Sequence, residues 1–182
     1  MIIASQKRKE NIAEYLLYMW QIEDLIRANN LDIDKIEENI VSHYNLSTED
    51  HVKMLEWYES LIDMMRREDV ALSGHLQLNK NVIIQLTDLH NTLLKDSRFS
   101  EYSVVFYKTL PFIVELRAKA NDNKVEEIET CFTALYGSLL LKLQGKEITT
   151  ETQNALKQIS HFMAVLAHYY KLDAEDKLFK EE

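Results

Sequence analysis

The stretch NIAEYLLYMWQIEDLIRANN, residues 11–30, decides the fold class. At about 100° per residue, its large apolar side chains form one wide face of a helix. The members of this face are Ile12, Tyr15, Leu16, Met19, Ile22 and Ile26. The polar stripe opposite is narrow and is interrupted by Leu17, while Trp20 stands to one side. A helix with so little polar surface is typical of the centre of a helical domain.

The composition of the whole chain favours the same class. Its 182 residues include only three Gly and one Pro, which turns and sheets use more freely than long helices do. We therefore predict an all-α fold, a compact bundle of six or seven helices. A single helical-bundle domain is expected over residues 1–172, and residues 173–182 form a charged tail that frays.

Capping residues and breaks place the helices along the chain. The first three expected helices cover residues 6–28, residues 34–43 with Asp34 as cap, and residues 49–69 with Ser47 or Thr48 as cap. A fourth runs from beyond Ser73-Gly74 to residue 95, and a fifth is capped by Ser100. A sixth ends at Gly145, and a seventh, capped by Thr150, runs to residue 171. Pro111 removes one backbone hydrogen bond from the fifth helix, so we expect a kink or a split there. The segment NDNK, residues 121–124, separates the fifth helix from the sixth.

Charge and cysteine content exclude several classes of function. The formal net charge is −9, whereas nucleic-acid binding draws most of its affinity from basic residues that neutralise phosphates. Cys131 is the only cysteine, which excludes an intramolecular disulfide or a cysteine-rich zinc site. The first residues lack the charge-then-apolar order of a signal peptide, and no stretch is long and apolar enough to span a membrane. We expect a cytoplasmic protein that binds neither nucleic acid nor membrane.

Glu23 and Arg27 are the polar residues of the first stretch that invite a functional reading. Glu23 lies at the edge of the apolar face and Arg27 follows one turn later, a spacing that favours an ion pair. In a functional reading Glu23 is a general acid or a metal ligand. In a structural reading the two residues form a partly buried, mutually neutralised pair. The structural reading is favoured, because catalytic carboxylates need companions that the sequence does not show.

His90 is the histidine most suited to a buried role. On the fourth helix it falls among apolar positions that include Val82, Leu86 and Leu93. A buried imidazole requires a hydrogen-bond partner, and Glu23, Tyr15 or Tyr107 are the candidates for it. A structurally satisfied histidine is more common than a catalytic one. If this chain has a chemically active polar cluster, Glu23, Arg27 and His90 are predicted to form it.

Recognised catalytic and metal-binding patterns are missing from the sequence. None of the six histidines has a Glu three residues before it, as di-iron bundles require. The zinc-protease pattern of two histidines four residues apart around a Glu is also missing, and the glycines stand too far apart for a phosphate loop. We therefore assign no catalytic residue, no metal and no cofactor.

The sixth helix carries small residues on the face opposite its apolar one. The apolar face consists of Val125, Ile128, Phe132, Leu135, Leu139 and Leu143. The opposite face, a candidate interface, consists of Thr130, Ala134, Gly137, Ser138 and Leu141. Small residues at this spacing let another helix approach closely. That helix belongs either to the same chain or to a second subunit, and the sequence favours neither.

Three segments carry a resemblance to a known family. KRKENIAEYLLYMWQIEDLIRA, GHLQLNKNVIIQLTDLHNTLLKD and YKTLPFIVELRAKAN resemble an all-helical bacterial family, domain of unknown function 4924. The resemblance covers essentially the whole chain. It implies a helical fold and a bacterial cytoplasmic setting, and it offers no catalytic residues.

These observations favour a non-enzymatic protein-interaction or oligomerisation module, either a homodimer or an adaptor for another protein. The alternative is a small-molecule-binding protein or a helical-bundle enzyme with a polar pocket around Glu23, Arg27 and His90. A groove lined by WYESLIDMM, residues 57–65, favours the first class. An enclosed polar cavity open to solvent favours the second.

Overall fold

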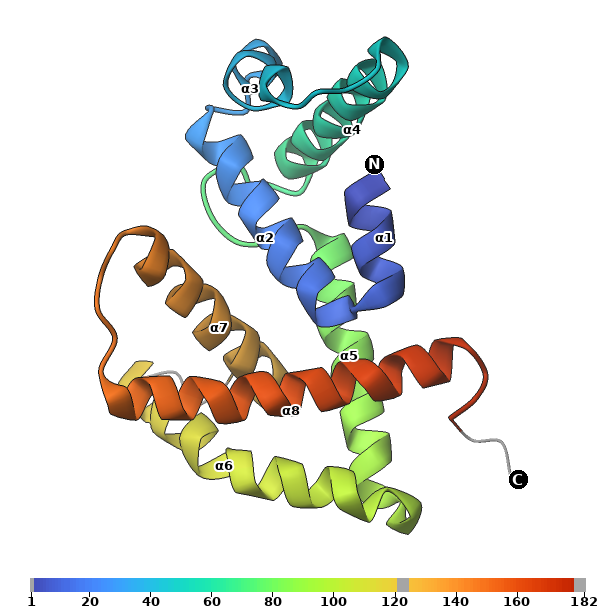
Figure 1. Cartoon of the computed structure of the whole chain (residues 1–182), viewed down its shortest axis with the longest axis vertical. Coiled ribbons are helices and arrows are strands. Elements are labelled where there is room, and N and C mark those ends of the chain that lie inside the picture. Colours follow the sequence, from blue (N-terminus) through green and yellow to red (C-terminus); the bar gives the residue numbers. More distant parts are fainter. Residues whose placement is uncertain (1, 121–124, 179–182) are drawn as a thin grey trace. The chain divides into compact units, whose positions relative to one another are not determined.

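The computed structural model describes residues 2–120 and 125–178, and every regular element in these two ranges is helical (Figure 1). The described residues form the α-helices α1 (Ile2–Glu10), α2 (Ile12–Ala28), α3 (Ile33–Asn39), α4 (Thr48–Arg67), α5 (Gln77–Lys95), α6 (Ser100–Ala120), α7 (Glu127–Leu143) and α8 (Thr150–Ala174), with short 3-10 helices η1 (Val41–His43) and η2 (Ser97–Phe99). The all-α prediction is confirmed. The predicted number of helices, six or seven, is too low for the described residues, which form eight.

The additional helix arises at Asn11, where the first expected helix is broken into α1 and α2. The side-chain oxygen of Asn11 accepts a hydrogen bond from the backbone N–H of Ala13 at 3.0 Å. Asparagine competes in this way with the helical backbone and favours the start of a new helix over the continuation of the old one. The basic residues Lys7 and Arg8 of α1 lie over the rings of Tyr18 and Tyr15 of α2, at 5.9 and 5.5 Å from the ring centroids.

Several other helix ends agree with the sequence to within one or two residues, although α3 ends at Asn39, four residues before the expected end. Ser47 caps α4 by accepting the N–H of Asp50. Gly145 follows α7 in the left-handed conformation, with φ of 68°, which glycine adopts at little cost. The caps of α3 and α8 are Asp32 and Thr149, where Asp34 and Thr150 were expected. In both cases a side-chain oxygen slightly earlier in the chain accepts the first helical N–H groups.

The described residues divide into two compact units. The first unit comprises residues 2–9 and 14–81, and the second comprises residues 10–13, 82–120 and 125–178. The boundary residues lie within α1, α2 and α5 rather than in loops. A single domain over residues 1–172 stays a prediction.

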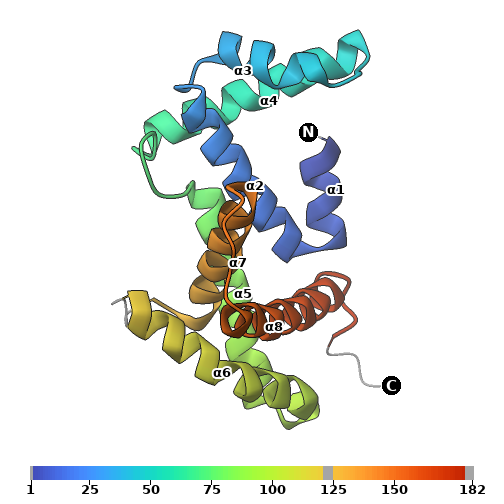
Figure 2. The ribbon, with the colours of Figure 1, turned by 60° about the vertical axis from the view of Figure 1, so that its left-hand side comes forward.

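In the first unit α3 packs against α4 (Figures 1 and 2). The core side chains contributed by α4 are Met54, Tyr58, Leu61, Ile62 and Met65. All six members of the apolar face predicted for residues 11–30 are buried, none more than 6% exposed. Val52, in the second turn of α4, is 49% exposed and lies outside this core.

In the second unit α8 packs against both α6 and α7 (Figures 1 and 2). Its aromatic core contains Tyr102, Phe106, Phe132 and Phe162. Pro111 lies inside α6, which continues to Ala120, so the alternative of two separate helices is wrong. Helix α8 ends at Ala174, three residues beyond the expected end. Two predictions lie outside the described residues: the NDNK break and the last four residues of the tail.

None of the described helices combines the length and the apolar character that a membrane crossing requires.

Candidate functional site

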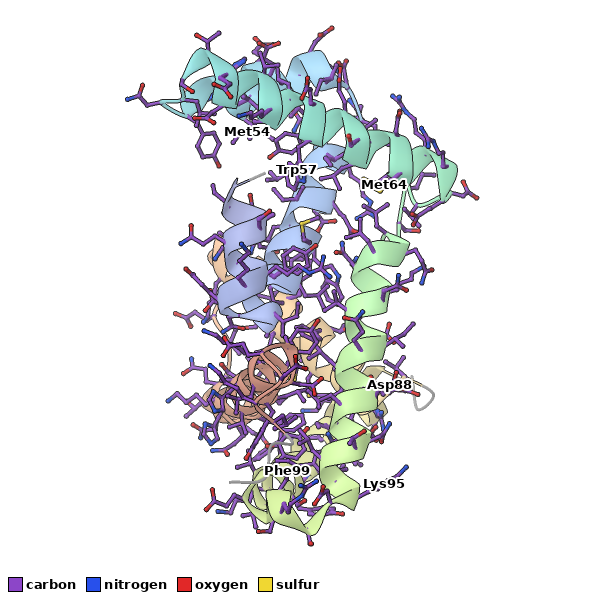
Figure 3. All side chains as sticks on the ribbon, turned by 90° about the vertical axis from the view of Figure 1, so that its right-hand side faces the viewer. Met54, Trp57, Met64, Asp88, Lys95 and Phe99 are labelled. Atoms are coloured by element: carbon purple, nitrogen blue, oxygen red, sulfur yellow. The ribbon has the colours of Figure 1, made fainter. Side chains whose placement is uncertain are left out.

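A groove in the first unit lies between α1 and α4. Its volume is about 930 Å³. Its apolar lining residues are Ile3, Tyr44, Leu46, Met54 and Trp57. Figure 3 shows Met54 and Trp57 on the side of α4 that is turned toward α1. The groove therefore includes two residues, Trp57 and Ser60, of the WYESLIDMM segment, which the sequence analysis considered as a groove lining. Further lining residues come from α1 and from the η1–α4 connection.

The rim of this groove carries both signs of charge. Lys9 and Lys53 supply positive charge, and Asp50 and Glu56 supply negative charge. Each of these side chains comes from α1 or α4, so the rim runs along both walls. A surface of this kind attracts ligands with both acidic and basic groups and does not select for polyanions.

A smaller hollow of about 170 Å³ adjoins the groove. The two share Ser5 and Trp57 in their linings, so the indole of Trp57 stands between them. The smaller hollow is lined in addition by Met19 and Met64, whose flexible side chains adapt readily to different apolar partners.

A buried polar cluster in the first unit is centred on Glu23, at the N-terminus of α5. Its carboxylate is 1% exposed. Oε1 accepts hydrogen bonds from the backbone N–H of Leu76 at 2.9 Å and from the side-chain amide of Asn79 at 2.7 Å. Negative charge is favourable at this position, because the free N–H groups at the start of a helix carry partial positive charge. Glu23 is therefore a buried carboxylate held by groups at the start of α5.

His75 completes the environment of Glu23. Its Nδ1 lies 2.6 Å from Glu23 Oε2. The imidazole ring stacks on the indole of Trp20, with ring centroids 4.0 Å apart and planes 9° from parallel. The His75 side chain remains 30% exposed. A carboxylate and an aromatic ring thus hold a partly exposed imidazole in one orientation.

Arg27 supports the loop that carries His75. Its guanidinium donates to the carbonyl oxygens of Val70, at 3.1 Å, and of Gly74. It also forms an ion pair with Asp24 at 2.9 Å. The expected Glu23–Arg27 pair is wrong. Glu23 points inward to α5, whereas Asp24, three residues before Arg27, is on the more exposed side of α2.

His90 does not supply the imidazole of this cluster. It lies in the second unit, is 3% exposed, and its Nδ1 is 2.5 Å from the hydroxyl of Tyr102. A tyrosine is the partner, as expected, but it is Tyr102 and not Tyr15 or Tyr107. Burial lowers the pKa of His90 to about 4, and burial also raises the pKa of Tyr102. The neutral imidazole accepts a hydrogen bond from the phenol of Tyr102, so His90 is a satisfied core residue, as the structural reading predicts.

The five interface residues predicted on α7 have different environments. Thr130 is 8% exposed and accepts a hydrogen bond from Arg117 of α6 at 3.2 Å, so it packs inside the second unit. Leu141 is 38% exposed. Ala134, Gly137 and Ser138 are partly exposed, and a Cβ added at Gly137 would meet no atom within 4 Å. Thr130 belongs to the core, and the self-association of the other four stays a prediction.

The Glu23–His75 pair could not be found from sequence spacing, because 52 residues separate the two side chains. The only local signal was the Ser73-Gly74 break, which places a histidine two residues before the start of α5. The described residues contain no group of three or more His, Cys, Asp or Glu side chains suited to a metal ion.

The chain belongs to the family described as domain of unknown function DUF4924, whose match covers residues 1–177. This confirms the resemblance seen in the sequence. No curated protein and no solved structure matches the chain. The family assigns no activity, so functional inference rests on the geometry of the groove and of the polar cluster.

Proposed function

We propose that this DUF4924 chain is a protein-interaction module whose α1–α4 groove binds an amphipathic helix of a partner protein. The groove itself carries the proposal. Its exposed lining surface is mostly apolar, its walls are helical and charged side chains border it, which is the arrangement of helix-in-groove recognition.

The size of the groove suits a helical occupant. A helix about 10 Å wide that fills roughly 930 Å³ is about 12 Å long, or about two turns. Two turns present apolar side chains at positions i, i+3, i+4 and i+7, which is enough for one continuous apolar face. The charges along both walls favour a helix with acidic and basic residues beside that face.

Trp57 is expected to be the main energetic contact. Tryptophan is the residue type most enriched among binding hot spots, because it buries a large rigid surface. The methionines beside it allow the groove to accept apolar side chains of different shape. Aromatic and methionine side chains are together typical of a recognition surface rather than of a solvated helix face.

A selection experiment tests the proposal and does not require the partner to be identified first. Amphipathic helical peptides displayed on phage would be selected on the wild-type protein and titrated by fluorescence anisotropy against the wild type, Trp57→Ala and Val52→Ala. Val52 is an exposed α4 residue outside the groove, so Val52→Ala is a matched control. We expect Trp57→Ala to weaken binding by about tenfold or more and Val52→Ala by less than about twofold.

Two results would overturn the proposal. One is that no helical peptide is enriched on the wild-type protein. The other is that Trp57→Ala binds the selected peptides as tightly as the wild type does. Circular dichroism of each variant shows that the fold is retained, and Ile3→Ser provides an independent change on the α1 wall.

A further inference from the structure

The Glu23–His75 pair leaves one ring nitrogen available for chemistry. Glu23 accepts two hydrogen bonds at Oε1, and its Oε2 lies 2.6 Å from Nδ1 of His75. An ionised carboxylate has no proton to donate. The hydrogen-bond network therefore places the proton of the neutral imidazole on Nδ1. Nε2 then carries the lone pair, and it has no hydrogen-bond partner among the described residues.

The side chain of His75 is held by more contacts than a surface histidine usually makes. The Glu23 carboxylate fixes the Nδ1 edge, and Trp20 covers one face of the ring. Arg27 holds the carbonyl of Gly74, the residue directly before His75. A nucleophile oriented by a base, which is itself held by other groups, is the arrangement found in covalent catalysis.

We propose that His75 is a nucleophile that accepts an acyl group at Nε2 from an activated ester, with Glu23 as its positioning residue. The lone pair of Nε2 attacks the carbonyl carbon, and the new C–N bond forms as the bond to the leaving alkoxide breaks. The Nδ1 proton stays on the ring, so the positive charge of the acyl-imidazolium lies against the Glu23 carboxylate. Water then attacks the acyl group, releases the carboxylic acid and restores His75, while the proton that is set free passes to the alkoxide.

The charges around His75 favour a neutral acyl group over an anionic phosphoryl group. Glu23 lies within hydrogen-bond distance of the ring. Glu68 accepts the N–H of Gln77, two residues beyond His75, at 2.6 Å. Two carboxylates at this end of α5 repel an approaching phosphate, whereas they do not repel an uncharged ester. The site is independent of the α1–α4 groove, whose lining does not include His75.

Diethyl pyrocarbonate, a neutral activated acyl donor, tests the reactivity of each histidine in one experiment. The rate of modification at each residue would be followed by mass spectrometry of the native protein. We expect His75 to react about tenfold faster than the more exposed His161 and His168, and the buried His90 not to react. In Glu23→Gln the rate at His75 should fall about tenfold, while the rates at His161 and His168 stay unchanged.

Hydrolysis of p-nitrophenyl acetate provides a second measurement. His75→Gln keeps a side-chain amide near Glu23 and should lower the rate of p-nitrophenolate release to the level set by the other histidines, whereas His161→Gln should leave the rate unchanged. The proposal is overturned if His75 in the wild type reacts no faster than His161, or if His75→Gln hydrolyses the ester as fast as the wild type. The wild-type comparison requires no variant and so remains decisive if Glu23→Gln does not fold.

Discussion

Arg27 of α2 donates a hydrogen bond to the carbonyl oxygen of Gly74, which lies 47 positions further along the chain. The same guanidinium bonds to the Val70 carbonyl, and its side chain is only 16% exposed. Arg27 thus holds two points of the connection between α4 and α5, one of which is the residue before His75. These bonds supply acceptors for the largely buried guanidinium of Arg27.

Replacement of Arg27 should destabilise the protein strongly. Arg27→Ala leaves the carbonyls of Val70 and Gly74 without their donor, and hydrogen bonds to charged groups contribute roughly 1.5–3 kcal/mol each. We expect the free energy of unfolding to fall by about 2–4 kcal/mol, measured by denaturant titration. Arg67→Ala, which breaks the exposed pair with Asp63, should cost less than about 1 kcal/mol. Equal midpoints for Arg27→Ala and the wild type would contradict the supporting role of Arg27.

Two glycine substitutions should have opposite effects on stability. Gly74 has a φ of 86°, which an alanine adopts only with strain, so Gly74→Ala should destabilise by about 1 kcal/mol. Gly137 lies inside α7 with open space at its Cβ position, so Gly137→Ala should stabilise by about 0.5–1 kcal/mol. Thermal or denaturant unfolding of both variants measures this, and a stabilising Gly74→Ala would show that the left-handed conformation is not required.

His90 should make the protein sensitive to acid. Its pKa is about 4 in the folded state, below the value of 6.5 for an unperturbed histidine, because burial disfavours the charged form. Below pH 6.5 the unfolded chain therefore binds the additional proton, so stability is full above this pH and is lost as the pH falls to about 4. The contribution of His90 to this loss is about 3 kcal/mol.

The variant His90→Gln isolates this contribution from that of the carboxylates. The difference between the unfolding free energies of the wild type and His90→Gln should change with pH between 7 and 4, in the direction that disfavours the wild type at low pH. His161→Gln, at an exposed position, should follow the wild-type profile. Parallel profiles for the wild type and His90→Gln would mean that His90 is protonated as easily in the folded protein as in the unfolded chain.

Self-association through α7 remains a prediction with a direct test. A two-fold contact would bring the strip around Ala134, Gly137 and Leu141 against its own copy. Gly137→Leu should then shift the protein toward monomer in sedimentation velocity without loss of helical content, since the position has room in a single chain. Glu129→Leu adds the same side chain on a different face of α7 and serves as the control. A wild-type protein that stays monomeric at high micromolar concentration excludes this interface.

Local patterns predicted more of the fold than of the site. The apolar face of residues 11–30, the Ser47 cap and the Gly145 helix end each depend on neighbouring residues, and the structure agrees with all three.

The break at Asn11 was missed because its capping bond competes with a helix of otherwise favourable composition. The partners of Glu23 lie more than 50 residues away, so helix periodicity pointed to the wrong partner, Arg27. The burial of His90 was predictable from its apolar neighbours, whereas the contact between His75 and Glu23 is tertiary and was not.

The break at Asn11 also has a thermodynamic consequence for the groove. One wall of the groove is a helix of nine residues, and an isolated helix shorter than about 12 residues is marginal in water. The helicity of α1 must therefore come from its contacts with the rest of the first unit, such as those of Lys7 and Arg8 with the tyrosines of α2. Any ligand that bridges α1 and α4 adds to these contacts, so ligand affinity and the local folding of α1 are linked quantities. Amide hydrogen exchange within α1 is accordingly a direct reporter of groove occupancy, even for a ligand that has not been identified.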